Sequence, residues 1–178
     1  MARTLIVPGL HDRGHSWQLW LETRLMDAAR VRIGQPSEPD LAAWSDDLQR
    51  ALDKTNTPCW LIARDFGALV TMSLLPNIRD SVLGLMLVAP ASPEHFGLSP
   101  SLASNPELPG LIFASTHDSN QRLTSAAFLA ERYGLRLVQQ ASPEPDAYAN
   151  NGAWPEALAA FKALMHAHGG VPQGNITD

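Results

Sequence analysis

The sequence predicts an α/β fold in which one six-stranded parallel sheet is covered by helices on both faces. Short apolar segments alternate along the chain with longer segments of helical periodicity, as in successive βαβ units. The apolar segments lie near residues 4–8, 30–34, 59–63, 83–89, 110–114 and 135–139. The chain has 178 residues, of which 45% are hydrophobic, and this is enough for one domain around a single core.

Two helices are expected between the first three strands, because apolar residues recur there at intervals of three and four. The two apolar faces consist of Trp17, Trp20, Leu21 and Leu25, and of Leu41, Trp44, Leu48 and Leu52. At this spacing the tryptophans indicate packing against the sheet rather than a ligand pocket. Further helices are expected near residues 67–76, 121–133 and 155–168. We therefore expect one domain over residues 1–168 and a flexible tail over 169–178.

Charge and cysteine content exclude several classes of function. Thirteen Lys and Arg residues against eighteen Asp and Glu residues give a net charge of −5, which does not favour binding to nucleic acid or to an anionic membrane. The single cysteine, Cys59, lies in an apolar segment and is expected to be a buried thiol. No charged leader or long apolar run is visible, so we expect a soluble, cytoplasmic protein without a membrane span. The pattern predicts no cofactor and leaves the oligomeric state open.

The segment with the clearest chemical potential is Ala63-Arg64-Asp65-Phe66-Gly67. An apolar strand leads into it and a helix follows, with a small residue on each side of the turn. This layout exposes a nucleophile on a sharp turn in some hydrolases. An aspartate that caps an ordinary helix would give the same pattern, so the rest of the chain must decide between the two.

Short motifs along nearly the whole chain favour the first interpretation. They are Val7-Pro8-Gly9-Leu10, Trp17-Gln18-Leu19-Trp20, Leu87-Val88-Ala89-Pro90, Ser115-x-x-Asp118 and Trp154-Pro155-Glu156. In this order and at these separations, they resemble the motifs of small bacterial serine hydrolases related to the retinoblastoma-binding serine hydrolase. The resemblance implies a single-domain, three-layer α/β-hydrolase fold with strand order 2-1-3-4-5-6 and no cap domain.

The resemblance also implies which residues occupy the positions of the Ser-His-Asp triad. Asp65 stands at the nucleophile position, and Arg64 replaces the histidine that precedes it. Asp118 stands at the acid position. Glu144 stands at the base position, or Asp146 if the gap before Trp154 is shifted.

Other groups are expected around the same pocket. The carboxyl ends of parallel strands form a groove, and the backbone N–H groups of Leu10 and Phe66 would point into it as oxyanion donors. His11 and His117 are expected at its rim, together with Arg64. We expect this groove to persist even without catalysis and to accept an unidentified small molecule.

Without a histidine base, the ordinary triad mechanism cannot operate. We therefore expect a divergent hydrolase relative without esterase activity. The alternative is a hydrolase that uses Asp65 as its nucleophile on a small ester, epoxide or halide, since the turn at Asp65 also resembles that of haloalkane dehalogenases and epoxide hydrolases. Attack by a carboxylate on carbon needs no base, but release of the product needs an activated water.

A cluster of carboxylates would result if the fold is kept, because Asp65, Asp118 and Glu144 or Asp146 would converge. Their mutual repulsion would require a cation, protonation or a nearby arginine such as Arg64. A simpler interpretation places the loop with Glu144 in solvent, and on this basis no metal site is predicted. The segment between Pro90 and Pro109 is the only candidate lid, and its Ser, Pro and Gly content favours a loop.

Overall fold

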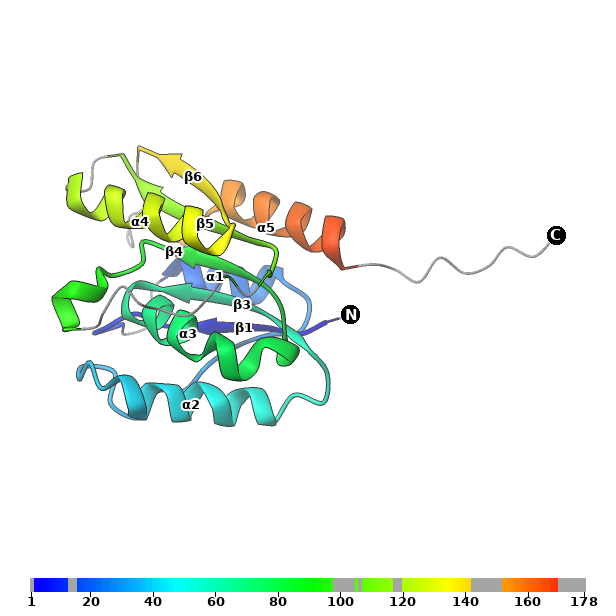
Figure 1. Ribbon diagram of the computed structural model, residues 1–178. Coiled ribbons are helices and arrows are strands. Elements are labelled where there is room, and N and C mark those ends of the chain that lie inside the picture. The colour runs from blue at the N-terminus through cyan, green and yellow to red at the C-terminus, as the bar shows by residue number, and fades with distance from the viewer. Residues whose placement is uncertain are drawn as a thin grey trace.

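Six parallel strands form one sheet in the order β2-β1-β3-β4-β5-β6. The computed structural model describes residues 2–12, 16–97, 105, 107–116, 120–141 and 152–169. The strands are β1 (Thr4–Val7), β2 (Ala28–Arg30), β3 (Cys59–Arg64), β4 (Val82–Val88), β5 (Gly110–Ser115) and β6 (Arg136–Gln140). The predicted parallel sheet and its strand order are confirmed, and all carboxyl ends lie at one edge (Figure 1).

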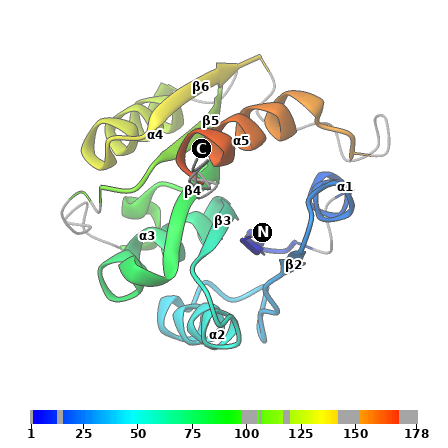
Figure 2. The same cartoon turned by 90° about the vertical axis from the view of Figure 1, so that its right-hand side faces the viewer.

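Helices cover both faces of the sheet, as predicted (Figure 2). One face carries α1 (Ser16–Arg24) and α5 (Pro155–His168), and the other carries α2 (Leu41–Asp53), α3 (Asp65–Ile78) and α4 (Asn120–Tyr133). Two short 3-10 helices, η1 (Arg79–Ser81) and η2 (Pro93–Phe96), complete the described elements. None of the described helices is long and apolar enough to cross a membrane.

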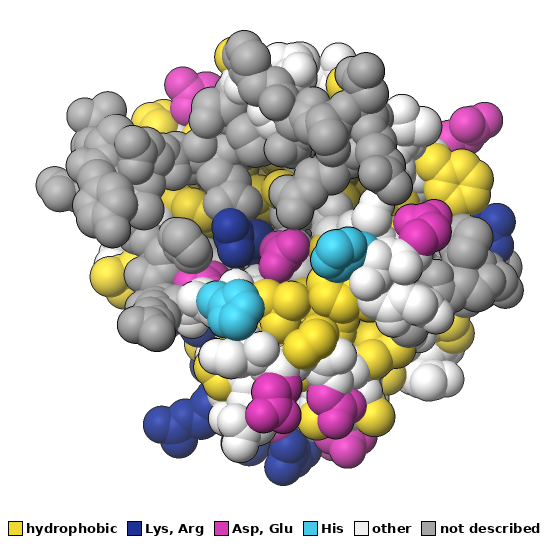
Figure 3. All heavy atoms as spheres, turned by 90° about the vertical axis from the view of Figure 1, so that its left-hand side faces the viewer, with side chains coloured by type: hydrophobic (Ala, Val, Ile, Leu, Met, Phe, Trp, Pro, Cys, Tyr) yellow, Lys and Arg dark blue, Asp and Glu magenta, His cyan; other side chains and the backbone are white. Residues whose placement is uncertain are grey.

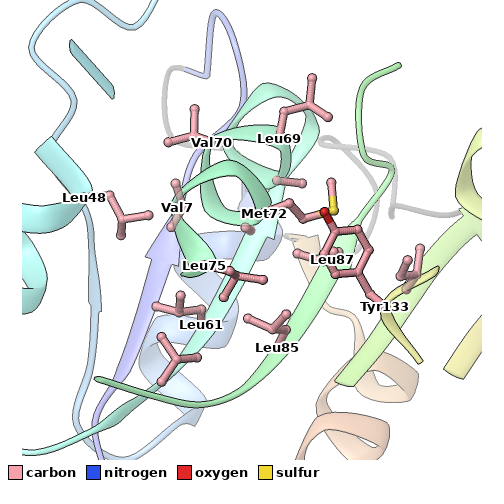
Figure 4. Close-up of a cluster of buried hydrophobic side chains, with 14 of the residues drawn as sticks. Val7, Leu48, Leu61, Leu69, Val70, Met72, Leu75, Leu85, Leu87 and Tyr133 are labelled. Atoms are coloured by element: carbon pink, nitrogen blue, oxygen red, sulfur yellow. The ribbon is translucent and has the colours of Figure 1, made fainter. Parts of the chain in front are cut away.

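The two layers of the core explain the apolar faces of the helices. On one side of the sheet, Trp44, Leu48 and Leu52 of α2 are buried with residues of α3 and α4 (Figure 4). On the other side, Trp17 and Leu21 of α1 are buried with residues of α5. Trp17 and Trp44 are fully buried, which confirms that they pack in the core. Cys59 is also fully buried, as expected.

The second strand is shorter and earlier than the sequence predicts. We expected residues 30–34, but β2 pairs with β1 only from Thr4↔Ala28 to Ile6↔Arg30. Beyond the ladder, the Val31 N–H still donates to the Ile6 carbonyl at 2.8 Å, and Val31 is buried in the core. Apolar side chains after the end of the strand therefore gave the segment its strand-like pattern.

Candidate functional site

The chain passes from β3 directly into α3 at a strained residue. Arg64 is the last residue of β3 and has an extended backbone, while Asp65 is the first residue of α3. Asp65 has a φ of 49°, in the left-handed region that costs most L-residues ~1–2 kcal/mol. Such strain persists only where the surrounding structure imposes it, and it is frequent at functional sites.

Close contact between β1 and α3 imposes this turn. A Cβ atom built on Gly67 would collide with the carbonyl oxygen of Pro8 and would lie 3.0 Å from Cγ1 of Val7. Only a glycine lets the first turn of α3 approach β1 so closely. The small residue that the sequence shows after Asp65 therefore has a physical reason at Gly67.

A second tight turn, immediately after β1, directs a backbone donor toward Asp65. The Asp12 N–H donates to the Gly9 carbonyl at 3.3 Å, and the His11 N–H donates to the Pro36 carbonyl at 2.9 Å. His11 has a φ of 56°, so this turn is strained as well. Within it, the Leu10 N–H donates to Oδ2 of the Asp65 carboxylate at 3.1 Å.

This hydrogen bond joins two groups that the sequence places in the same site. Leu10 was expected to supply an oxyanion donor, which in acyl transfer stabilises the negative oxygen of the reacting substrate. Its acceptor here is a carboxylate of the protein itself, and hydrogen bonds to ionised acceptors are about twice as strong as neutral ones. Among the described residues, no histidine side chain hydrogen-bonds to Asp65.

Arg64 lies beside the same carboxylate. A Cβ atom built on Gly9 would be 2.6 Å from Nη1 of Arg64 and 3.2 Å from Oδ2 of Asp65, so both charged groups border the same point. Opposite charges that border the same point attract one another. The half-buried guanidinium therefore adds positive charge next to Asp65. Its role in compensating a cluster of carboxylates stays a prediction.

Phe66 can serve the site only through its backbone. Its side chain is fully buried and packs against Trp44, with ring centroids 5.1 Å apart, and against Phe96 at 4.8 Å. The N–H of Phe66 belongs to the first turn of α3, where N–H groups have no partner within the helix. Its role as an oxyanion donor stays a prediction.

The segment after β4 borders the site, and the sequence did not identify its histidine. The Ala91 N–H donates to the Asp65 carbonyl at 3.2 Å, and Phe96 of η2 packs on Phe66. His95 is exposed and lies against Phe96, with ring centroids 5.2 Å apart. The 3-10 helix that presents it has no apolar periodicity, so the sequence indicated only a loop.

The carboxyl edge of the sheet brings these groups to one face of the molecule. Figure 3 shows histidine, acidic and basic side chains around a patch of hydrophobic side chains on this face. His11 follows β1 and is exposed, and its place at the rim of the groove stays a prediction. Positive φ angles occur at His11, Asp65 and Ala89, each just past the end of a strand.

The other predicted triad positions cannot be placed in the same way. His117, Asp118, Glu144 and Asp146 lie outside the described residues, so their roles stay predictions. In the part of the chain that the structure describes, no group of three or more His, Cys, Asp or Glu side chains has an arrangement that would hold a metal ion.

Comparison with known proteins identifies the family. Residues 4–163 match the model of the serine hydrolase family. A YdeN-like hydrolase from Pectobacterium atrosepticum is 29% identical, with a TM-score of 0.80 over 94% of this chain and 92% of its own.

Two less similar structures share the fold. The ydeN gene product from B. subtilis has a TM-score of 0.75 at 17% identity, over 93% of this chain and 100% of its own. Est1E from Butyrivibrio proteoclasticus has a TM-score of 0.66 at 16% identity, over 94% of this chain and 88% of its own. No curated protein sequence matches. The chain belongs to the serine hydrolase family and has the α/β-hydrolase fold.

Proposed function

We propose that this chain is a divergent member of its family that lacks esterase activity and retains a ligand-binding groove at the carboxyl edge of the sheet. The observation that carries the proposal is the hydrogen bond from the Leu10 N–H to Oδ2 of Asp65. It places an ionisable oxygen of the protein on the donor that would otherwise stabilise a substrate oxyanion.

The chemistry of acyl transfer explains why this arrangement opposes hydrolysis. An ester carbonyl would have to displace the Asp65 carboxylate from the Leu10 N–H, and a neutral carbonyl is a weaker acceptor than an anion. A serine hydroxyl is absent at this turn, and Arg64 cannot act as a base because its guanidinium does not lose its proton in proteins.

The same carboxylate indicates which ligands the groove would favour. An acceptor-only group at the floor of a groove pairs with hydrogen-bond donors. We therefore propose a ligand with hydroxyl, amide or ammonium groups near Asp65, and not one that presents an ester carbonyl there. Arg64 would keep the carboxylate in place while such a ligand binds.

Hydrolysis assays test the absence of esterase activity. Purified protein and an Asp65→Asn variant should hydrolyse p-nitrophenyl acetate and butyrate at the same background rate. The variant is nearly isosteric and keeps an oxygen for the Leu10 N–H to bond. Turnover by the wild type that the substitution abolishes would contradict the proposal.

An Asp65→Ser variant tests separately whether a base is present. Fluorophosphonate probes label activated serines, and the proposal predicts no labelling of this variant because no base removes the proton of the hydroxyl. Rapid labelling of Ser at this position would show that a base is present after all. In that case, the nucleophile would be the only part of the family's triad that this chain has lost.

The hydrogen bond also favours one alternative function, hydrolysis with Asp65 as the nucleophile. It holds Oδ2, and no hydrogen bond to Oδ1 is found among the described residues. Oδ1 would attack a carbon that bears a halide, the halide would leave with the bonding electrons, and an ester of Asp65 would form. Water would then attack Cγ, release the alcohol and leave one water oxygen on Asp65. This second step needs a base.

A further inference from the structure

A cavity lies one strand away from Asp65, on the outer side of β1. Its volume is about 310 Å³, which is at the lower end of the range for small-molecule sites. It opens between α1 and the carboxyl ends of β1 and β2, and it is lined by Pro8, Asp12, Gln18, Arg30, Arg32 and Ile33, among others. Neither Arg64 nor Asp65 lines it.

Gln18 lines this cavity and presents a buried polar group to it. The residue is only 1% exposed, and its buried amide nitrogen donates no hydrogen bond to a described residue. The amide oxygen accepts no hydrogen bond from a described residue either. A buried polar group without a partner costs ~1–3 kcal/mol, so such groups in native proteins call for an explanation. Since Gln18 lines the cavity, a ligand there would satisfy it.

Two arginines border the same cavity and differ in how they are held. The Nε of Arg30 pairs with Oε2 of Glu22 on α1 at 2.8 Å, which orients the guanidinium and leaves its terminal nitrogens for another acceptor. Arg32 is exposed and forms no ion pair with any described residue. It follows Arg30 by two positions, so in extended backbone both side chains point to the same side.

We infer that this cavity binds a small carboxylate that also carries a hydroxyl or amide group. Arg30 and Arg32 would hold the carboxylate, since guanidinium groups match its geometry. Gln18 would bond to the neutral polar group. Inorganic phosphate has no carbon skeleton to contact the apolar part of the lining, which argues against it as the ligand. Pro8 and Ile33 would contact the carbon skeleton.

Calorimetric titration with L-malate, succinate and inorganic phosphate tests this inference. L-malate and succinate share their carboxylates and differ by one hydroxyl group. Wild-type protein should bind L-malate about tenfold more tightly than succinate, since one hydrogen bond of a buried amide accounts for roughly that factor. It should bind phosphate more weakly than either.

Three variants connect the result to the cavity. Arg32→Gln should weaken L-malate binding about tenfold, as expected for the loss of one charged hydrogen bond, and Arg136→Gln, an exposed arginine on β6, should leave it unchanged. Gln18→Leu should remove the preference for L-malate over succinate without unfolding the protein, because it replaces an unsatisfied amide by an apolar group. Melting temperatures verify that each variant is folded.

Several outcomes would overturn the inference. They are equal affinity for L-malate and succinate in the wild type, unchanged L-malate binding by Arg32→Gln, or no heat of binding with either acid at millimolar concentration. Asp65→Asn should bind L-malate as the wild type does. The experiment therefore distinguishes failure of this site from failure of the proposed function at Asp65.

Discussion

Asp65 combines two features that an ordinary helix cap does not require. It has a left-handed backbone, and its carboxylate accepts a hydrogen bond from a residue 55 positions earlier in the chain. The sequence identified Asp65 through the spacing of its neighbours. It could not predict the acceptor of the Leu10 N–H, because that depends on the turn at His11 and on how closely α3 approaches β1.

Substitution of Asp65 should separate the contributions of backbone strain and of the hydrogen bond. Asp65→Asn keeps an acceptor for the Leu10 N–H and a residue type that tolerates the left-handed region, so it should lower the free energy of unfolding by less than about 1 kcal/mol. Asp65→Ala loses both and should lower it by about 1–2 kcal/mol more. Urea denaturation measures the difference, and equal stability of the two variants would contradict this account.

Among the elements, the junction of β3 and α3 has the strictest geometric requirement. The sequence predicted it because an apolar strand, a five-residue turn and a helix are adjacent in the chain. Elements without such local signals were misplaced or missed. The short pairing of β2 with β1 depends on register, and η2 depends on packing of Phe96 against Phe66.

Gly67→Ala tests how closely α3 approaches β1. The added methyl group would collide with backbone at Pro8, which cannot move without displacing β1. We expect a loss of more than about 2 kcal/mol in the free energy of unfolding, because overpacking against backbone is poorly tolerated. Gly34→Ala is the matched control, since its added methyl group meets nothing closer than 3.7 Å. Similar urea midpoints for both variants would show that the junction is looser than described.

Helix α4 contains a buried hydroxyl that forms no hydrogen bond with any described residue. It belongs to Tyr133, which is 1% exposed and whose side chain points toward Met72 in the core (Figure 4). Burial raises the pKa of Tyr133, because the charged form is poorly solvated there.

Removal of this hydroxyl should not destabilise the protein. Tyr133→Phe should leave the free energy of unfolding unchanged or raise it by up to about 1 kcal/mol. The melting temperature should accordingly stay the same or rise. Thr71→Val provides the contrast, since the Thr71 hydroxyl donates to the Gly67 carbonyl at 2.8 Å and its loss should cost about 1 kcal/mol. A lower melting temperature for Tyr133→Phe would show that the hydroxyl has a partner.

At the scale of the whole molecule, the free energy of unfolding at high pH depends on the burial of Cys59, the first residue of the central strand β3. Burial raises the pKa of the Cys59 thiol to about 11, above its ordinary value of 9.0. Below pH 9 the thiol is neutral in both states and contributes nothing. Between these two values only the unfolded chain loses the proton, so stability falls as the pH rises.

Cys59→Ala should remove this part of the pH dependence. Between pH 8 and pH 10, the free energy of unfolding should fall by about 1 kcal/mol more in the wild type than in the variant. The comparison isolates the thiol from other groups that titrate in this range, Tyr133 included. Parallel stability curves for the two proteins between pH 8 and 10 would contradict the burial of Cys59.

The sequence predicted the fold more fully than the site. Periodicity and motif order were enough for the sheet, its strand order and the helices on both faces, because these depend on patterns that extend along most of the chain. The site depends on contacts between segments that are distant in the sequence, such as Leu10 with Asp65. For Asp118 and for Glu144 or Asp146, the resemblance to the family remains the only guide.

Oxygen-isotope labelling tests most directly whether Asp65 has lost a catalytic role. The protein is incubated in H₂¹⁸O with a haloalkane or an epoxide, and the peptide that contains Asp65 is analysed by mass spectrometry. Hydrolysis of the alkyl ester at Cγ would place one oxygen from water on a carboxylate nucleophile in each turnover. We expect no ¹⁸O in Asp65 above that of a sample without substrate. Substrate-dependent incorporation at Asp65 would contradict it and establish Asp65 as a nucleophile.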